Sequence, residues 1–128
     1  MALNPEEWLR QADYDMESAD AMFSTGRYIY TVFMCHLAVE KGLKGLYQKQ
    51  MKVLPPKSHS LVYFVEKLRL DMPSALSDFV ETLNNLSVPT RYPEDLQKAL
   101  SEFTKTKTDD ALKKGKDVLK WIEMMFEK

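Results

Sequence analysis

The sequence predicts an all-α protein, an antiparallel bundle of four to five helices that occupies residues 1–128 as a single domain. Apolar residues recur at steps of three and four along most of the chain, which is the spacing of one helix face. Prolines and helix-capping residues interrupt this pattern, and strand-like alternation is short wherever it occurs. Of the 128 residues, 45% are hydrophobic, which is enough for one core without disulfides or metals.

The run "NPEE" at residues 4–7 predicts the start of the first helix. Asn4 is a capping residue, Pro5 suits the first helical position, and Glu7 stands where it can close a capping box. Gly26 predicts the end of this helix, because glycine readily adopts the left-handed conformation of a helix terminus. The expected apolar stripe consists of Trp8, Ala12, Met16, Ala19, Met22 and Phe23.

A second helix is expected from about Tyr28 to Gln50, with a broad apolar surface. Such a broad surface indicates burial on more than one side. The only cysteine, Cys35, lies within this segment, which excludes an internal disulfide and fits a reducing cytosol. We expect Cys35 to be a small buried hydrophobic residue. The apolar surface includes Tyr28, Val32, Phe33, Val39, Leu43, Leu46 and Tyr47.

Two proline-containing breaks separate the next two expected helices. Pro55 and Pro56 end the second helix, and Ser58 is the expected cap of a third helix that continues through Leu68. The run Asp71–Pro73 starts a fourth helix, whose stripe consists of Leu76, Phe79, Val80, Leu83 and Leu86.

The last third of the chain is expected to begin irregularly. The segment "SVPTRYPEDLQ" at residues 87–97 contains two prolines and is interpreted as an irregular connection. A short helix is expected over Leu96, Leu100 and Phe103. The run Thr108-Asp109-Asp110 predicts the start of the final helix, because capping residues and acids favour a helix N-terminus.

Charge and hydropathy limit the classes of partner. The net charge of −1 provides no overall positive field for DNA or an anionic membrane. The start "MALNPEEWLRQADYDMESAD" lacks a basic region followed by an apolar one, and no apolar run approaches the roughly 18 residues of a membrane span. We therefore expect a cytoplasmic protein that binds neither DNA nor membrane.

The charges are nevertheless distributed unevenly. Residues 1–40 carry seven acids against two bases, whereas residues 41–57 carry five lysines and no acid. One interpretation is that an anionic ligand binds near the lysines. The alternative is that the lysines solvate a helix end and interact favourably with its dipole.

Most standard catalytic motifs are absent from the sequence. It contains no phosphate-binding loop, dinucleotide-binding glycine run or nucleophile elbow. A two-metal carboxylate site in a bundle needs Glu-x-x-His pairs, but Phe33 and Pro56 stand three residues before the two histidines. His36 and Glu40 supply only one pair of ligands, so we expect neither a metal nor a cofactor.

One polar row lies on the second expected helix. His36, Glu40 and Lys44 are spaced four residues apart and share one face, with Lys41 beside them. Glu40 and Lys44 alone would make an ordinary surface ion pair. The apolar residues around the row favour a second interpretation, in which it borders a cleft or a subunit interface.

Several segments together resemble the HEPN domain (higher eukaryote and prokaryote nucleotide-binding). These are "AVEKGLKGLYQKQ" with the preceding "GRYIYTVFMCH" and the following "PPKSHSLVYFVEKL", then "TRYPED", and the outer helices "WLRQADYDMESADAMF" and "DDALKKGKDVLKWIE". The resemblance extends over nearly the whole chain. It implies a helical bundle that forms a homodimer.

The resemblance also implies a function. Small members in bacteria or archaea are often paired with a separately encoded minimal nucleotidyltransferase, and some such pairs are toxin–antitoxin systems. The partner transfers a nucleotidyl group, while the HEPN subunit binds nucleotide, presents substrate or is itself modified. We therefore expect a non-catalytic subunit of this kind.

Two alternatives remain open. Other members are metal-independent ribonucleases with an arginine followed by histidine after four to six residues, but eight residues separate Arg27 from His36. A divergent, toxin-like ribonuclease would use His36 or His59 with Glu40. The second alternative is a dimeric interaction module that binds no nucleotide.

Six residues are the expected nucleotide- or substrate-binding set, and no catalytic residue is assigned. Lys41 and Lys44 would neutralise phosphate oxygens, Arg91 would add a forked donor, and Tyr92 would stack on a base or ribose. Glu40 would hold a lysine or accept from a sugar hydroxyl, and His59 would donate to an anion at the start of the third helix. Each also has a structural interpretation: Tyr92 and His59 pin loops, Lys41 is solvated, and His36 is a satisfied core histidine.

Overall fold

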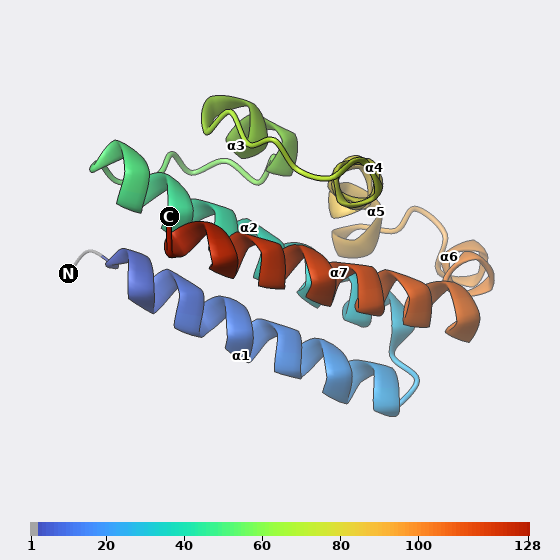
Figure 1. The fold of residues 1–128 in the computed structure, drawn as a ribbon. Coiled ribbons are helices and arrows are strands. Elements are labelled where there is room, and N and C mark those ends of the chain that lie inside the picture. The colour runs from blue at the N-terminus through green and yellow to red at the C-terminus, as the bar shows by residue number, and fades with distance from the viewer. Residues whose placement is uncertain (1–2) are drawn as a thin grey trace.

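Three long helices lie side by side along most of the molecule (Figure 1). The structure is a computed structural model and describes residues 3–128. Within this range no strand is present, and none of the helices combines the length and the hydrophobicity that a membrane span requires. The all-α prediction is confirmed. The helices are α1 (Pro5–Ser24), α2 (Tyr28–Met51), α3 (Leu61–Lys67), α4 (Ser74–Asn85), α5 (Ser87–Arg91), α6 (Leu96–Glu102) and α7 (Lys105–Phe126).

The long helices differ in relative direction. Helix α1 is antiparallel to α2, and the Trp8 indole near the start of α1 donates to Gln48 Oε1 near the end of α2, at 2.9 Å. Helix α7 is parallel to α2, since Gly42 faces Ile122, and Gly45 further along faces Phe126. The predicted antiparallel arrangement therefore holds for α1 relative to α2 and α7, but not for α2 relative to α7. The connection through α3–α6 returns the chain to the other end before α7 begins.

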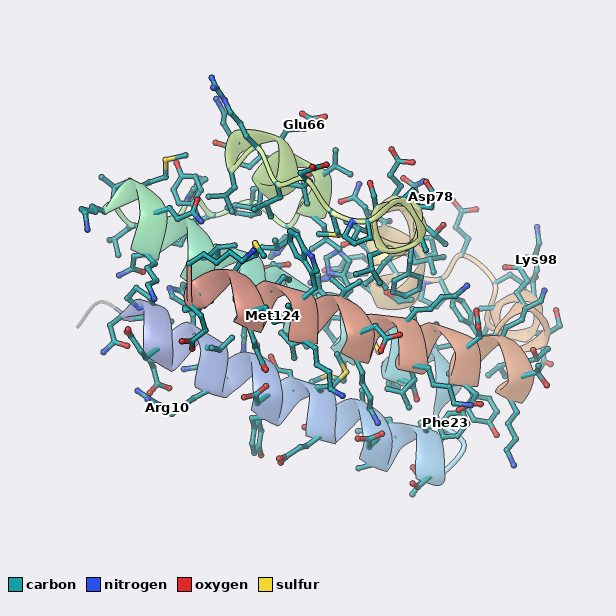
Figure 2. The ribbon with its side chains drawn as sticks, viewed as in Figure 1. Arg10, Phe23, Glu66, Asp78, Lys98 and Met124 are labelled. Atoms are coloured by element: carbon teal, nitrogen blue, oxygen red, sulfur yellow. The ribbon has the colours of Figure 1, made fainter. Side chains whose placement is uncertain are left out.

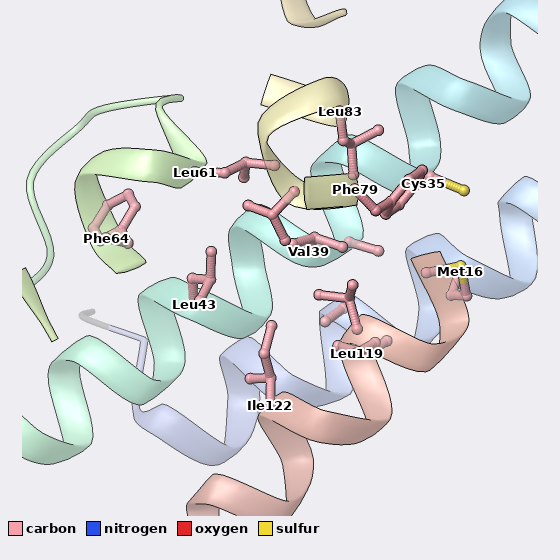
Figure 3. Close-up of a cluster of buried hydrophobic side chains, with 14 of the residues drawn as sticks. Met16, Cys35, Val39, Leu43, Leu61, Phe64, Phe79, Leu83, Leu119 and Ile122 are labelled. Atoms are coloured by element: carbon pink, nitrogen blue, oxygen red, sulfur yellow. The ribbon is translucent and has the colours of Figure 1, made fainter. Parts of the chain in front are cut away.

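The shorter helices form a second layer over α2, opposite α1 (Figure 1). Charged side chains such as Arg10, Glu66 and Lys98 project away from the helices (Figure 2). Between the layers, Val39 of α2 packs in one cluster with Phe64 of α3 (Figure 3). Of the 24 residues of α2, 13 are buried, which confirms that this helix is covered on more than one side. The cluster also includes Leu43, Leu61, Phe79, Leu83, Leu119 and Ile122.

The predicted boundaries of the first two helices are confirmed. Asn4 Oδ1 accepts a hydrogen bond of 2.7 Å from the Glu7 amide. The Glu7 side chain accepts from Arg10 and Gln11, so only the asparagine half of the predicted capping box is formed. Gly26 has a φ of 76°, the left-handed conformation expected after α1.

Three details of the shorter elements differ from the sequence prediction. Ser60 rather than Ser58 caps α3, because its Oγ accepts from the Tyr63 amide at 3.1 Å. Residues 87–91, expected to be irregular, form α5, in which Pro89 lies in the first turn, where its missing N–H removes no helical hydrogen bond. Helix α7 begins at Lys105, one turn before Thr108, because Thr104 Oγ1 caps it by accepting from the Lys107 amide.

The only cysteine is part of the core. Cys35 is fully buried and faces Gly115 of α7, which confirms the prediction of a small buried residue. Burial raises the pKa of its thiol to about 12. The thiol is therefore protonated at neutral pH and unsuited to nucleophilic chemistry.

Candidate functional site

A buried carboxylate, Glu40, is the centre of the polar row on α2. Only 3% of the surface of Glu40 is exposed to solvent. Glu40 Oε2 accepts from Lys44 Nζ at 3.0 Å, one helical turn further along. Its Oε1 and Oε2 lie 3.0 and 3.1 Å from Nδ1 of His59, which comes from the segment before α3. Helix α2 and the connection to α3 thus each place one basic group on this carboxylate.

Lys44 is a buried partner of Glu40. Its side chain is 9% exposed, and its Nζ lies 5.8 Å from the centre of the Trp8 ring and 6.0 Å from that of Phe64. Aromatic faces stabilise a cation through their quadrupole. Lys44 is therefore positioned to hold Glu40 and to contribute positive potential from below the surface.

His59 has the opposite exposure. Its side chain is 62% exposed, while its Nδ1 is held by Glu40. A buried carboxylate that bonds one imidazole nitrogen orients the ring and leaves the other nitrogen available. His59 can therefore present Nε2 to a ligand or substrate.

His36 lies inside the protein, one turn before Glu40. It is 0% exposed, and its Nδ1 is 3.7 Å from Glu40 Oε1, too far for a hydrogen bond. Neither ring nitrogen has a hydrogen-bond partner within residues 3–128. Burial lowers the pKa of His36 to about 4, because the opposing effect of Glu40 is smaller and the charges of Arg91 and His59 act in the same direction as burial. His36 is neutral at pH 7, and its lack of partners differs from the satisfied core histidine considered from the sequence.

Arg91 brings a further cation to this side of the molecule. Its guanidinium lies 4.7 Å from the centre of the Phe33 ring of α2, and its Nη1 is buried without a hydrogen-bond partner in the described part of the chain. Its charge reaches far enough to lower the pKa of His36. Arg91 thus belongs electrostatically to the group around Glu40.

The other two predicted residues lie elsewhere. Lys41 Nζ is 2.9 Å from Asp15 Oδ2 of α1, so its charge is paired on the α1 side of α2. Tyr92 is 76% exposed and lines a groove of about 500 Å³ along α5 and α6. We call Glu40, Lys44, His59 and Arg91, with the buried His36, the Glu40 cluster.

The lysine-rich segment is less available to a ligand than its composition indicates. Of its five lysines, Lys41 pairs with Asp15, Lys44 with Glu40, and Lys49 donates to the Phe126 carbonyl. Lys52 and Lys57 are exposed. Three of the five lysines in this segment therefore already form contacts within the protein.

Three residues that support the Glu40 cluster or its neighbours carry no signal in the sequence. These are Asp15, which neutralises Lys41, Phe33, which stacks under Arg91, and the ring of Phe64 beside Lys44. All three contacts join residues of different helices, and no local pattern marks them. Within residues 3–128, no group of three or more His, Cys, Asp or Glu side chains is arranged to hold a metal ion.

Comparisons with known proteins agree with the helical architecture. The structure is similar to TT1696 from Thermus thermophilus, with 25% identity, a TM-score of 0.80, and coverage of 94% of this chain and 97% of that one. It is also similar to ST0689, an archaeal HEPN homologue, with 25% identity, a TM-score of 0.78, and coverage of 95% and 97%. A search of curated proteins finds no match. The sequence model of the HEPN domain matches residues 5–125, and the chain therefore belongs to the HEPN domain family.

Proposed function

We propose that this chain is a non-catalytic HEPN subunit that binds a nucleotide or nucleotide-bearing substrate and acts with a separately encoded minimal nucleotidyltransferase. One observation carries the proposal. A buried carboxylate holds Lys44 and His59, and the nearby Arg91 retains a buried guanidinium nitrogen without a partner in the described residues. A guanidinium with an unpartnered donor and an imidazole oriented by a carboxylate are both groups that bind phosphate.

The balance of charge around Glu40 supports an anionic ligand. Glu40 is the one acid of the Glu40 cluster, against the guanidinium of Arg91, the ammonium of Lys44 and the imidazole of His59. The excess of positive charge lies in partly buried surroundings, where screening by salt is weaker than on an open surface. Arg91 and His59 contact the ligand in this proposal, and Lys44 acts through Glu40.

Arg91→Gln is expected to weaken binding of an adenine or guanine nucleotide by on the order of 10-fold or more, the effect of losing a charge-assisted hydrogen bond. Calorimetric titration of the full chain with ATP and GTP measures this. Arg27→Gln is the matched control, because it removes the same charge from an exposed arginine at the start of α2. Equal affinity of both variants and the parent would remove Arg91 from the site.

The partner is tested separately. A tagged chain purified from its native host, with co-purifying proteins identified by mass spectrometry, is expected to bring a small nucleotidyltransferase in near-stoichiometric amount. Light scattering of the purified chain is expected to give the mass of a homodimer. Recovery of a self-associated chain alone, without nucleotide binding, would support the dimeric interaction module instead.

The geometry of Glu40 and His59 favours a second candidate, a divergent metal-independent ribonuclease. A carboxylate that orients Nδ1 and leaves Nε2 exposed is an arrangement used in general acid–base catalysis. An assay on single-stranded RNA in the presence of a chelator separates the two candidates. RNA cleavage by the parent protein that is lost in His59→Ala would support the ribonuclease. If the parent protein does not cleave RNA, the non-catalytic binding subunit is favoured.

A further inference from the structure

A cavity of about 540 Å³ lies between α4, α6 and α7, and part of its wall comes from α2. This volume is typical of sites for small organic molecules. The cavity shares no residue with the Glu40 cluster, although Val32 is one helical turn before His36. Its apolar lining includes Val32, Phe79, Leu86, Phe103 and Ala111.

Thr108 adds an unusual polar group to this lining. The residue is 1% exposed, and its Oγ1 is buried with no hydrogen-bond partner in the described range. The buried hydroxyls of Thr31 and Thr90 behave differently, because they donate to the carbonyls of Arg27 and Leu86, at 3.0 and 2.7 Å. A buried hydroxyl without a partner destabilises a protein. The Thr108 hydroxyl therefore lacks a hydrogen-bond partner at the wall of this cavity.

The charged residues of the cavity indicate the sign of such a molecule. Asp110 is paired with Lys114 at 2.9 Å, so these two charges largely cancel. Asp78 of α4 (Figure 2), Glu102 of α6 and Lys107 of α7 also line the cavity and form no ion pair within residues 3–128. Two acids against one base leave a net negative charge, which favours a cation.

We propose that this cavity binds a small organic cation with a ring and an amine. The ring contacts Phe79 and Phe103, a hydrogen-bonding group of the ligand reaches Thr108 Oγ1, and the ammonium group lies near Asp78 and Glu102. Cationic amines satisfy both features of the site, because their apolar body removes the phenylalanine rings from water while their charge stays at the polar edge. This site is independent of nucleotide binding at the Glu40 cluster.

Two probes with one ring and opposite charges test the proposal. Tryptamine and indole-3-propionate are titrated into the isotope-labelled full chain, and amide shifts are followed by NMR. Tryptamine is expected to shift the amides of Thr82, Thr108 and Ala111 and to bind at least about 10-fold more tightly than indole-3-propionate, since only it gains a charge-assisted contact. Absence of shifts at the cavity, or equal affinity of the two probes, would overturn the proposal.

Variants identify the groups involved. The double variant Asp78→Asn with Glu102→Gln is expected to reduce tryptamine affinity about 10-fold, whereas Glu66→Gln, an exposed acid of α3, leaves it unchanged. An undiminished affinity in the double variant would contradict the assignment of the cation. The NMR spectrum of the double variant reports whether that variant is folded. The comparison of the two oppositely charged probes needs only the parent protein.

Thr108→Val distinguishes a ligand contact from a structural role. Valine has nearly the same shape and no hydroxyl, so the thermal midpoint of the ligand-free protein is expected to rise while tryptamine affinity falls several-fold. A hydroxyl needed only for folding would give a lower midpoint. A lower midpoint, or tryptamine affinity equal to that of the parent, would contradict the role assigned to Thr108.

Discussion

Replacement of Glu40 by alanine is expected to lower the free energy of unfolding by about 3–5 kcal/mol, a large share of the roughly 5–15 kcal/mol that stabilises a typical domain. The carboxylate is the partner of Lys44 Nζ and of His59 Nδ1. Without it, an ammonium group that is almost fully buried between Trp8 and Phe64 has no anion beside it. The loss thus comes mainly from the unpaired charge of Lys44.

Urea unfolding followed by circular dichroism measures this loss. Asp109→Ala is the matched control, because Asp109 and Lys113 form an ion pair with the same i, i+4 spacing at 2.9 Å, with the lysine exposed to solvent. Surface pairs of this kind contribute little, so its effect is expected to be much smaller. Similar losses in the two variants would show that burial of Lys44 is not the cause.

A double variant tests whether the unpaired charge of Lys44 causes this loss of stability. Glu40→Leu combined with Lys44→Met removes both buried charges and keeps similar side-chain volumes. Such replacements of buried ion pairs are often neutral or stabilising, so the double variant is expected to recover most of the stability lost in Glu40→Ala. A double variant as unstable as the single one would mean that Glu40 acts mainly through His59.

Gly45→Ala is expected to destabilise the protein by about 1–3 kcal/mol, even though alanine favours a helix by roughly 1 kcal/mol over glycine. A Cβ at this position would lie 2.9 Å from Trp8 Cβ, 3.0 Å from the Pro5 carbonyl oxygen and 3.1 Å from Phe126 Cζ. The first two contacts are with backbone or with an atom attached directly to it. Helix α1 would therefore have to move away from α2, which also disturbs the bond from Trp8 to Gln48.

Gly115→Ala is the control for this prediction. A Cβ there meets Cys35 Sγ at 3.4 Å, an ordinary contact distance, so the helix preference of alanine is expected to raise stability by about 0.5–1 kcal/mol. Thermal unfolding, followed by the combined fluorescence of Trp8 and Trp121, compares the two variants. A Gly45→Ala variant that is as stable as the parent protein, or more stable, would contradict the close approach of α1 to Gly45.

The positions of most helices could be predicted because their signals are local. Asn4 and Gly26 mark the ends of α1, since a cap and a left-handed turn depend on a few neighbouring residues. The same reasoning placed the start of α7 at Thr108, which is a good capping residue in isolation. Thr104 is an equally good cap one turn earlier, and in the folded protein Thr108 is buried in the helix.

The candidate site was only partly predictable, because only part of it depends on residues that are neighbours in the chain. The spacing of His36, Glu40 and Lys44 on one helix face follows from helix geometry, so the row was visible in the sequence. Whether that row faces water depends on what packs over it. The segment before α3 covers it and adds His59, and α1 instead takes up Lys41 through Asp15.

The sequence by itself determined the all-α class, the long helices and the membership of the HEPN family, because helix periodicity, capping and family motifs are written in neighbouring residues. The tertiary structure alone decided which charges are buried and with whom they pair. Two such contacts are the one between Glu40 and His59 and the one between Arg91 and the Phe33 ring. They join elements that meet only when the helices pack. Burial then determines the ionisation of His36 and leaves Thr108 without a partner among the described residues, because the energy of a polar group depends on its surroundings in space rather than on its neighbours in the chain.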